Sequence, residues 1–335
     1  MNETPSRRPM TFTFLELLDR TFRIYRENFL TIVGLVALVT VPITILELIL
    51  NSATTRPLNS QSLGSAFAAS SGVGLISNIL NLIQTVLIYA PLTYIASEYL
   101  FNRKVSISEA FSGARDRFTK VGCGLILLGF VIVIFAIVVF FVGAIFPPLF
   151  ALAGILIYVF VSASVLLFPV LTLEDVSSSA GITRSYSLGK RRFWAAIGLS
   201  LILSIIGGLL GAILGGSVTL LVLSIAPSTS TTLQYGLITF LTTLISIVIT
   251  PLSPIGFTLL YYDIRVRSEG LDIMLDSSEG AGARPINFAS PPNKFGLDGH
   301  DWRNIAILTI GGLVIGLLVS APIIAFVNQY SRSLR

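Results

Sequence analysis

The residues of this sequence with the clearest potential for binding chemistry close a long apolar run. They combine two tyrosines, alternating charges and a final glycine: Tyr261, Tyr262, Asp263, Arg265, Arg267, Glu269 and Gly270. A continuing helix would pair charges that stand four positions apart, which joins Asp263 to Arg267. The same spacing joins Arg265 to Glu269, and Gly270 could end the helix.

This motif, residues 261–270, has two interpretations. In the first, the planar guanidinium groups of Arg265 and Arg267 bind a lipid phosphate or a protein partner. In the second, which we favour, the motif is a structural clamp. The clamp would tie the end of its helix to basic helices at the membrane surface.

Basic residues also stand just ahead of three apolar runs. Alignment on Phe29, Phe118 and Phe193 brings apolar residues into common columns eleven and seven positions earlier, and basic residues three positions earlier. These spacings predict three amphipathic helices in the cytoplasmic interface. The candidates for headgroup binding are the basic residues at the ends of these helices: Arg26, Arg115, Lys190, Arg191 and Arg192. Alternatively, the columns only reflect the basic and aromatic residues common wherever a cytoplasmic segment enters a bilayer.

A third candidate set lies inside an apolar run, where polar side chains are rare. Asn78, Asn81 and Gln84 share one helical face and could line a polar cavity. We favour the alternative that these amides form hydrogen bonds with neighbouring helices. Glu47 is the sole candidate for a buried carboxylate within an apolar run, where a charge is costly unless it is used.

The sequence offers little for catalysis or for cofactor binding. It has one cysteine, Cys123, and one histidine, His300, which argues against zinc and iron–sulfur sites. It contains no P-loop, no dinucleotide fingerprint and no HExxH motif. We therefore predict no catalytic residue, no metal, no cofactor and no nucleic-acid partner, and we expect the protein not to be an enzyme.

The elements that must position these residues are apolar helices. The chain has 335 residues, of which 53% are hydrophobic and only 12% are charged. Seven segments reach the roughly 20 apolar residues that a membrane span needs: 29–50, 73–97, 121–146, 149–172, 193–225, 233–262 and 304–327. We predict an all-α, polytopic transmembrane bundle. The fifth span is long enough to be tilted, broken or extended beyond the bilayer, and Pro251 and Pro254 should kink the sixth.

Basic residues define the predicted orientation. Of the 22 Lys and Arg residues, only Arg56, Arg332 and Arg335 fall on one side of the predicted spans, so 19 fall on the other. Because positive charge is retained in the cytoplasm, the amino terminus is predicted to be cytoplasmic and the carboxyl terminus to lie outside. The expected location is a cell membrane of the bacterial inner-membrane type.

We divide the chain into a six-span membrane domain (1–276), a cytoplasmic linker (277–303) and an additional span with a short tail (304–335). Within the first, a threefold repeat would comprise residues 12–100, 105–172 and 178–262. Each unit would be one interfacial helix followed by a two-helix hairpin.

The run YYDIRVRSEG, with SYSLGKRRFW ahead of an earlier span, resembles the membrane domain family named after glycerophosphoryl diester phosphodiesterases. The resemblance extends to related uncharacterised bacterial six-span proteins and covers roughly residues 12–276. It implies a six-helix core with both ends cytoplasmic and no established biochemical role. The acidic metal-binding motif and catalytic histidines of the phosphodiesterase domain have nothing to map onto, so that activity does not carry over. The seventh span departs from the family pattern.

The sequence suggests two functions and argues against a third. The first is a non-enzymatic scaffold or assembly factor whose partners are membrane lipids, anionic ones included, and other membrane proteins or further copies of itself. The second is a transporter or channel for a neutral or amphipathic solute, which would use the face of Asn78, Asn81 and Gln84. A membrane-embedded phosphodiesterase would need acidic metal ligands at one membrane face, and the sequence offers none. We expect the scaffold.

Overall fold

The computed structural model describes residues 11–54, 63–145, 152–225, 229–277, 296–311 and 314. Every regular element within these residues is a helix. Within those residues the predicted all-α class is confirmed. Among the described residues, six helical stretches, several of which join consecutive helices, are long and apolar enough to cross a membrane: Phe29–Leu50, Gly74–Leu100, Ile107–Phe141, Ala153–Leu173, Ser178–Ile225 and Leu233–Glu269. They correspond to the first six predicted spans and fit a multi-pass membrane protein. Most of the predicted seventh span, 304–327, lies outside the described residues.

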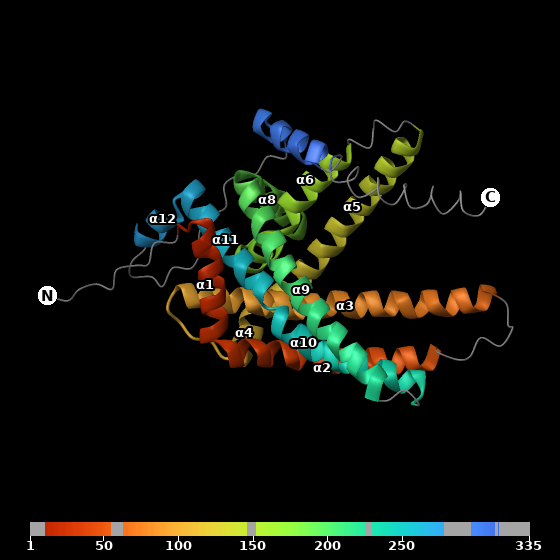
Figure 1. Ribbon diagram of the computed structural model, residues 1–335. Coiled ribbons are helices and arrows are strands. Elements are labelled where there is room, and N and C mark those ends of the chain that lie inside the picture. Colours follow the sequence, from red (N-terminus) through yellow and green to blue (C-terminus); the bar gives the residue numbers. More distant parts are fainter. Residues whose placement is uncertain are drawn as a thin grey trace.

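Figure 1 shows how the helices are arranged. Their bounds are α1 Phe14–Glu27, α2 Phe29–Thr54, α3 Leu63–Leu100, α4 Ile107–Ala114, η1 Arg115–Arg117, α5 Phe118–Ile145, α6 Leu152–Ser164, α7 Leu167–Leu173, α8 Ser178–Gly189, η3 Lys190–Arg192, α9 Phe193–Ile225, α10 Thr231–Ile249, α11 Leu252–Glu269 and α12 Leu271–Ser277. Residues 299–311 form a further helix.

A short helix stands before each of the long helices α2, α5 and α9, which begin at Phe29, Phe118 and Phe193. Side-chain caps explain where the short helices begin. Thr13 and Ser106 form capping boxes at the starts of α1 and α4, and Ser177 caps α8. The helix α8 buries seven of its twelve residues and packs against α5, α6 and α7. That these helices lie in a membrane interface stays a prediction, as does the threefold repeat.

Prolines account for the interruptions in the long helices. The sixth predicted span is interrupted between α10, which ends at Ile249, and α11, where Pro251 is the cap residue. The interruption lies where the kink is predicted. The fourth span also breaks, between α6 and α7, where Pro169 in the first turn of α7 cannot donate to the carbonyl of Val165. The fifth span is one unbroken helix, α9, of 33 residues.

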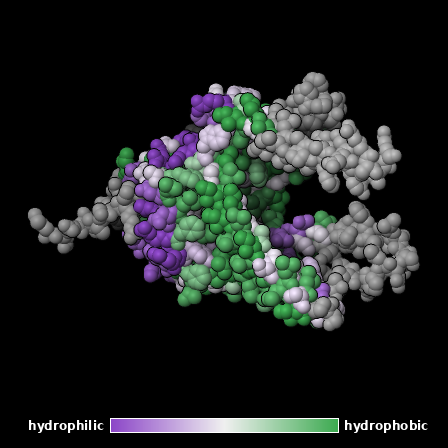
Figure 2. Space-filling model, in the orientation of Figure 1, coloured by the Kyte–Doolittle hydropathy of each residue, from purple (hydrophilic) through white to green (hydrophobic). Residues whose placement is uncertain are grey.

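The helix α11 occupies the centre of the bundle. It contacts α1, α3, α7, α8 and α9, and nearly all of its residues from Leu252 to Val266 are buried. Figure 2 shows hydrophilic side chains gathered over the end of the molecule that carries α1, α12 and the end of α11. Hydrophobic side chains cover the adjoining region. We call the hydrophilic end of the bundle the polar end.

The helix 299–311 packs against α6 and is the unlabelled blue helix of Figure 1. Tyr158 of α6 donates a hydrogen bond to Asp301, and Gly154, one turn earlier in α6, lies against Ile305 and Thr309. A side chain at Gly154 would overlap Thr309. Because the contacts move backward along α6 as the later helix advances, the two helices are antiparallel.

Candidate functional site

The motif at the end of α11 forms the local contacts that its spacing predicts. Arg267 Nε lies 2.8 Å from Asp263 Oδ1, and Arg265 Nε lies 3.0 Å from Glu269 Oε2, so both predicted ion pairs are confirmed. Gly270 ends the helix with φ 63° and ψ 39°, a left-handed conformation that favours glycine. Its N–H donates to the carbonyl oxygen of Val266.

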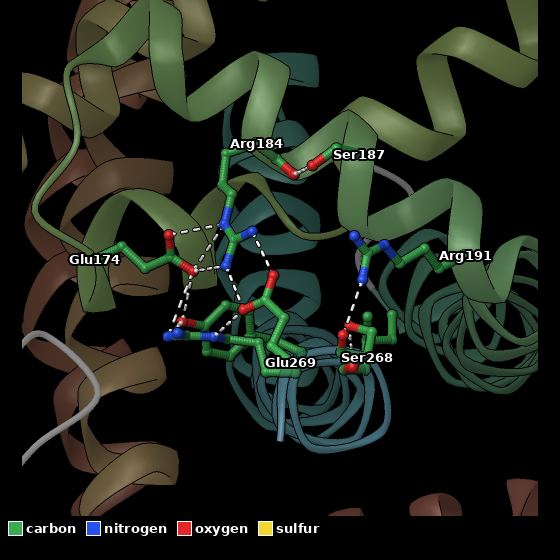
Figure 3. A network of polar contacts seen from close by, with 9 residues as sticks. Glu174, Arg184, Ser187, Arg191, Ser268 and Glu269 are labelled. Carbon is green, nitrogen blue, oxygen red and sulfur yellow. Dashed lines mark hydrogen bonds and ion pairs between the residues drawn. The ribbon is translucent and has the colours of Figure 1, made fainter. Parts of the chain in front are cut away.

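Four buried charges and one tyrosine form what we call the inner cluster: Glu174, Arg184, Tyr261, Arg265 and Glu269. Arg184 lies between the two carboxylates, with Nε 2.9 Å from Glu174 Oε2 and Nη1 2.5 Å from Glu269 Oε1 (Figure 3). Arg265 Nη1 stands 3.6 Å from Glu174 Oε1 and donates to the Tyr261 hydroxyl at 3.0 Å. That hydroxyl donates to Glu174 Oε1 at 2.9 Å.

The inner cluster is electrically balanced and closed to solvent. Its four charged side chains are between 0% and 5% exposed, and two guanidinium groups meet two carboxylates. A buried ion pair gains little net stability over an apolar substitute, but loss of one partner leaves an uncompensated charge and costs about 3–5 kcal/mol. The cluster therefore fixes α8 and the end of α7 against α11.

A second group, the outer cluster, consists of Asp263, Arg192, Arg267 and the backbone of Phe12. Asp263 is fully buried, and its Oδ1 accepts the N–H of Phe12 at 2.7 Å in addition to Arg267 Nε. Its Oδ2 accepts from Arg192 Nη1. The carbonyl oxygen of Phe12 accepts from Arg267 Nη2 at 3.1 Å and from Arg192 Nη1 at 3.4 Å. One carboxylate thus joins the segment before α1 to α11 and to η3.

Further contacts extend these connections to other elements. The hydroxyls of Tyr262 and Ser97 lie 2.6 Å apart and link α11 to α3. Arg191 Nη1 donates to the carbonyl oxygen of Ser268 at 3.3 Å, a contact also drawn in Figure 3. Together with the inner and outer clusters, they favour the clamp interpretation of residues 261–270.

Lys190 holds the segment that leads into the helix 299–311. Its Nζ lies 2.9 Å from Asp298 Oδ2 and 3.3 Å from Asp301 Oδ2, and it donates to the carbonyl oxygen of Gly296 at 3.2 Å. Burial acts to raise the pKa of Asp301. It is outweighed by hydrogen bonds from the Asp298 N–H, Tyr158 and Lys190, which hold that pKa below its ordinary value.

The basic residues predicted to bind headgroups fall into two groups. Lys190 and Arg192 are engaged with carboxylates in the contacts above. Arg26, Arg115 and Arg191 are exposed. Within the described parts of the chain, none of these three has a carboxylate within ion-pair distance. They stand where helices of the polar end meet the long helices α2, α5 and α9.

The amides of α3 contact α2. Asn81 Nδ2 donates to Glu47 Oε1 at 3.2 Å and to the carbonyl oxygen of Ser77 at 2.9 Å. Gln84 Nε2 donates to the hydroxyl of Thr40 at 3.4 Å, and Asn78 is exposed. These bonds between neighbouring helices favour the packing interpretation of this face over a polar cavity.

A groove of about 240 Å³ lies elsewhere, between α9 and α10. Its walls combine a glycine strip with three hydroxyl residues, Thr242, Ser246 and Thr250. Each of these hydroxyls donates to a carbonyl of its own helix. Their hydrogen-bonding capacity is therefore largely used within α10, and the groove is predominantly apolar.

Glu174 and Arg184 belong to the site, although no motif in the sequence predicts them. Both stand in the short polar stretch between two apolar runs, only ten positions apart. The available signal for this ion pair was a carboxylate directly after a span, followed by an arginine in the next helix. Among the described residues, no group of three His, Cys, Asp or Glu side chains could hold a metal ion.

Comparison with known proteins gives no relative from which a function could be transferred. No protein-family model, no curated protein and no solved structure matches the chain.

Proposed function

We propose that this chain is a non-enzymatic membrane scaffold that binds anionic lipid headgroups and membrane partners at its polar end. The proposal places that end in the cytoplasm and the chain in a cell membrane of the bacterial inner-membrane type. It rests on the six apolar helices and on where the charged side chains of the described residues gather.

The position of the exposed arginines carries the proposal. Arg26 and Arg115 each stand three residues before the first residue of a long helix, and Arg191 stands two residues before α9. Basic side chains at the end of a span lie at headgroup level, where each adds roughly 1 kcal/mol of attraction to an anionic surface. Three such positions on one end of a bundle suit a lipid-binding face.

The state of the buried carboxylates supports a scaffold over an enzyme. Asp263, Glu174 and Glu269 each bond to at least one arginine, and Asp301 bonds to Lys190 and Tyr158. A general acid or base needs a carboxyl group within reach of substrate and with an adjustable pKa. Carboxylates neutralised inside a clamp serve the rigidity of the polar end instead.

The contacts between α2 and α3 support a scaffold over a transporter. Asn81 and Gln84, which a solute pathway would use, bond to Glu47 and Thr40 of the neighbouring helix.

We also propose that the chain is related to the membrane domain family named after glycerophosphoryl diester phosphodiesterases, which it resembles in sequence. The most specific run of that resemblance, residues 261–270, is the part of the chain that organises the polar end.

Lipid retention by the purified protein tests the proposal. The full chain is extracted from a membrane of known composition, and the phospholipids retained are quantified by mass spectrometry. We expect enrichment of anionic over zwitterionic lipid, and a loss of most of that enrichment when Arg26, Arg115 and Arg191 are all changed to Gln.

A matched triple variant controls for net charge. Arg23, Arg103 and Lys120 each pair with a carboxylate, and their joint replacement by Gln should leave the enrichment nearly unchanged. Retention of anionic and zwitterionic lipid in bulk proportion, combined with crosslinking in native membranes that recovers only this chain, would end the proposal.

A further inference from the structure

The inner and outer clusters each contain two arginines but differ in the number of carboxylates. In the inner cluster, Arg184 and Arg265 meet two glutamates and all four side chains are buried. In the outer cluster, Arg192 and Arg267 share the single carboxylate of Asp263. The outer cluster therefore carries one positive charge in excess, and its arginine side chains are 26% and 45% exposed.

The buried partners of the outer cluster fix which guanidinium nitrogens remain available. Asp263 and the Phe12 carbonyl occupy Nε and Nη2 of Arg267, and Nη1 of Arg192. Arg267 Nη1 and Arg192 Nε and Nη2 have no partner among the residues that the structure describes. Both guanidinium groups bond to the same two acceptors, the Asp263 carboxylate and the Phe12 carbonyl, which hold them beside each other.

Two side chains of opposite charge on α1, Arg20 and Glu16, stand next to the outer cluster. The guanidinium carbon of Arg20 lies 4.4 Å from the centroid of the Phe12 ring. Glu16, the carboxylate on this side of α1, accepts the N–H of Thr13 in the capping box. With Arg20 and Glu16 included, the excess of one positive charge remains, since each cancels the other.

The position of Arg192 places the cluster at the level of lipid headgroups. Arg192 directly precedes Phe193, the first residue of the long apolar helix α9. Trp194 follows and is 45% exposed. Trp is enriched where a span meets the membrane surface, next to the phosphate groups of the lipids.

We propose that Arg192 and Arg267, held by Asp263, form a binding site for a phosphate group, supplied by an anionic phospholipid. The site rests on the proposed function, because it gives the lipid-binding face one specific position. Two guanidinium groups can offer paired N–H donors to phosphate oxygens, and such charge-assisted bonds are about twice as strong as neutral ones. The excess charge of the cluster would be neutralised by the bound phosphate diester.

Binding of short-chain lipids to the purified full chain tests the site. The probes are dioctanoyl phosphatidylglycerol, dioctanoyl phosphatidylcholine and inorganic phosphate. We expect the phosphatidylglycerol to bind most tightly and Arg267→Gln to weaken it about tenfold or more, which corresponds to about 1.4 kcal/mol. Asp263 keeps Arg192 and the Phe12 N–H in this variant, so the fold should persist.

Arg23→Gln is the matched control. Arg23 is 50% exposed and pairs with Asp19 four positions earlier, as Arg267 pairs with Asp263. Its replacement should change the affinity less than about twofold, because Arg23 takes no part in the outer cluster and its exposed charge is already balanced by Asp19. Should Arg267→Gln fail to fold, Arg267→Lys keeps the charge but loses the planar fork, and a several-fold weaker affinity is expected.

The outcomes separate the site from the proposed function. Equal losses in Arg267→Gln and Arg23→Gln would overturn the site, while enrichment of anionic lipid on the purified chain would leave the proposed function standing. Inorganic phosphate that binds as tightly as the lipid and depends equally on Arg267 would overturn the lipid as the source of the phosphate. Wild-type protein without preference between the two lipids, and without lipid enrichment, would overturn both.

Discussion

At the scale of single residues, Arg184 is a charged side chain without contact with solvent. It is completely buried and donates to both Glu174 and Glu269. We predict that Arg184→Gln lowers the free energy of unfolding by about 3–5 kcal/mol, because Arg265 alone would then face two buried carboxylates. Chemical unfolding of the detergent-solubilised protein would measure this loss.

The exposed pair between Arg23 and Asp19 supplies the comparison. Their side chains are 50% and 67% exposed, so Arg23→Gln should cost less than about 1 kcal/mol. A similar small cost for Arg184→Gln would mean that solvent reaches the inner cluster. The cluster would then not act as a buried clamp.

Asp175 gives a prediction for pH. Hydrogen bonds from Lys120 and then Arg117 lower the pKa of Asp175 from its ordinary 3.8 to about 2. A carboxylate whose pKa is lowered by folding contributes stability above its unfolded pKa, and this contribution is lost as the pH falls through the folded value. The stability advantage of the wild type over Asp175→Asn should therefore be constant above about pH 5 and shrink between about pH 4 and pH 2.

Melting temperatures of both proteins, recorded across that pH range, test this expectation. The two curves should converge toward acid, because the protonated Asp175 no longer attracts Lys120 and Arg117. Parallel curves would show that the two basic residues do not stabilise the folded carboxylate.

At the scale of elements, Gly189 decides how closely the end of α8 approaches α6. A Cβ atom at Gly189 would overlap the backbone carbonyl of Ser162. Unlike a flexible side chain, this backbone group cannot move away without a shift of the helix. We predict that Gly189→Ala separates α8 from α6 and destabilises the protein by about 1–3 kcal/mol, the usual cost of overpacking. The melting temperature would report it.

Gly129 of α5 is the matched control for that substitution. A Cβ atom there would meet nothing within 4 Å, and alanine favours a helix over glycine. Gly129→Ala should leave the melting temperature unchanged or raise it slightly. An equal loss in both variants would point to a general sensitivity of glycines, and not to the approach of α8 to α6.

Local signals in the sequence were sufficient to predict several features of the elements. The pairs of charges four apart in α11, the end of that helix at Gly270 and the break near Pro251 were all predictable. The break before α7 was missed, although Pro169 was a signal for it. Each of these features depends on residues within one or two helical turns.

Contacts between distant residues could not be predicted in the same way. The Phe12 N–H donates to Asp263 across 251 positions, and Arg184 meets Glu269 across 85. These partners are chosen by how the helices pack, and many basic residues of the polar end could have paired with either carboxylate on charge alone. The pairing of residues in the inner cluster could therefore not be predicted from the sequence, although each of its residues can be read there.

At the scale of the whole molecule, the ionic contacts gather at the polar end while apolar side chains cover the long helices. In a bilayer, lipid tails are as apolar as leucine, so burial of apolar surface does little to choose among arrangements of helices. The inner and outer clusters can make that choice, because each joins segments far apart in the chain. The helix α11 enters both clusters, and nearly all of its residues from Leu252 to Val266 are buried.

The helix 299–311 yields a prediction for the topology of the whole chain. It begins beside Lys190 at the polar end and runs antiparallel to α6, so it points toward the opposite end of the bundle. If the rest of the predicted span 304–327 continues in that direction, the carboxyl terminus lies on the other side of the membrane from the amino terminus. We expect a reporter that is active only outside the cytoplasm to be active when fused after Arg335. A reporter that is active only in the cytoplasm should be active when fused after Gly296.

The same experiment tests the resemblance to the six-span family, which implies that both ends are cytoplasmic. A reporter after Arg335 that works only inside the cell would contradict the seventh span and favour a six-span chain. Asp301→Asn adds a check that depends on the structure, because it weakens the bonds to Lys190 and Tyr158 that start this helix at α6. If those bonds guide insertion, the variant should move part of the carboxyl-terminal reporter to the inside, while Asp175→Asn should leave it outside.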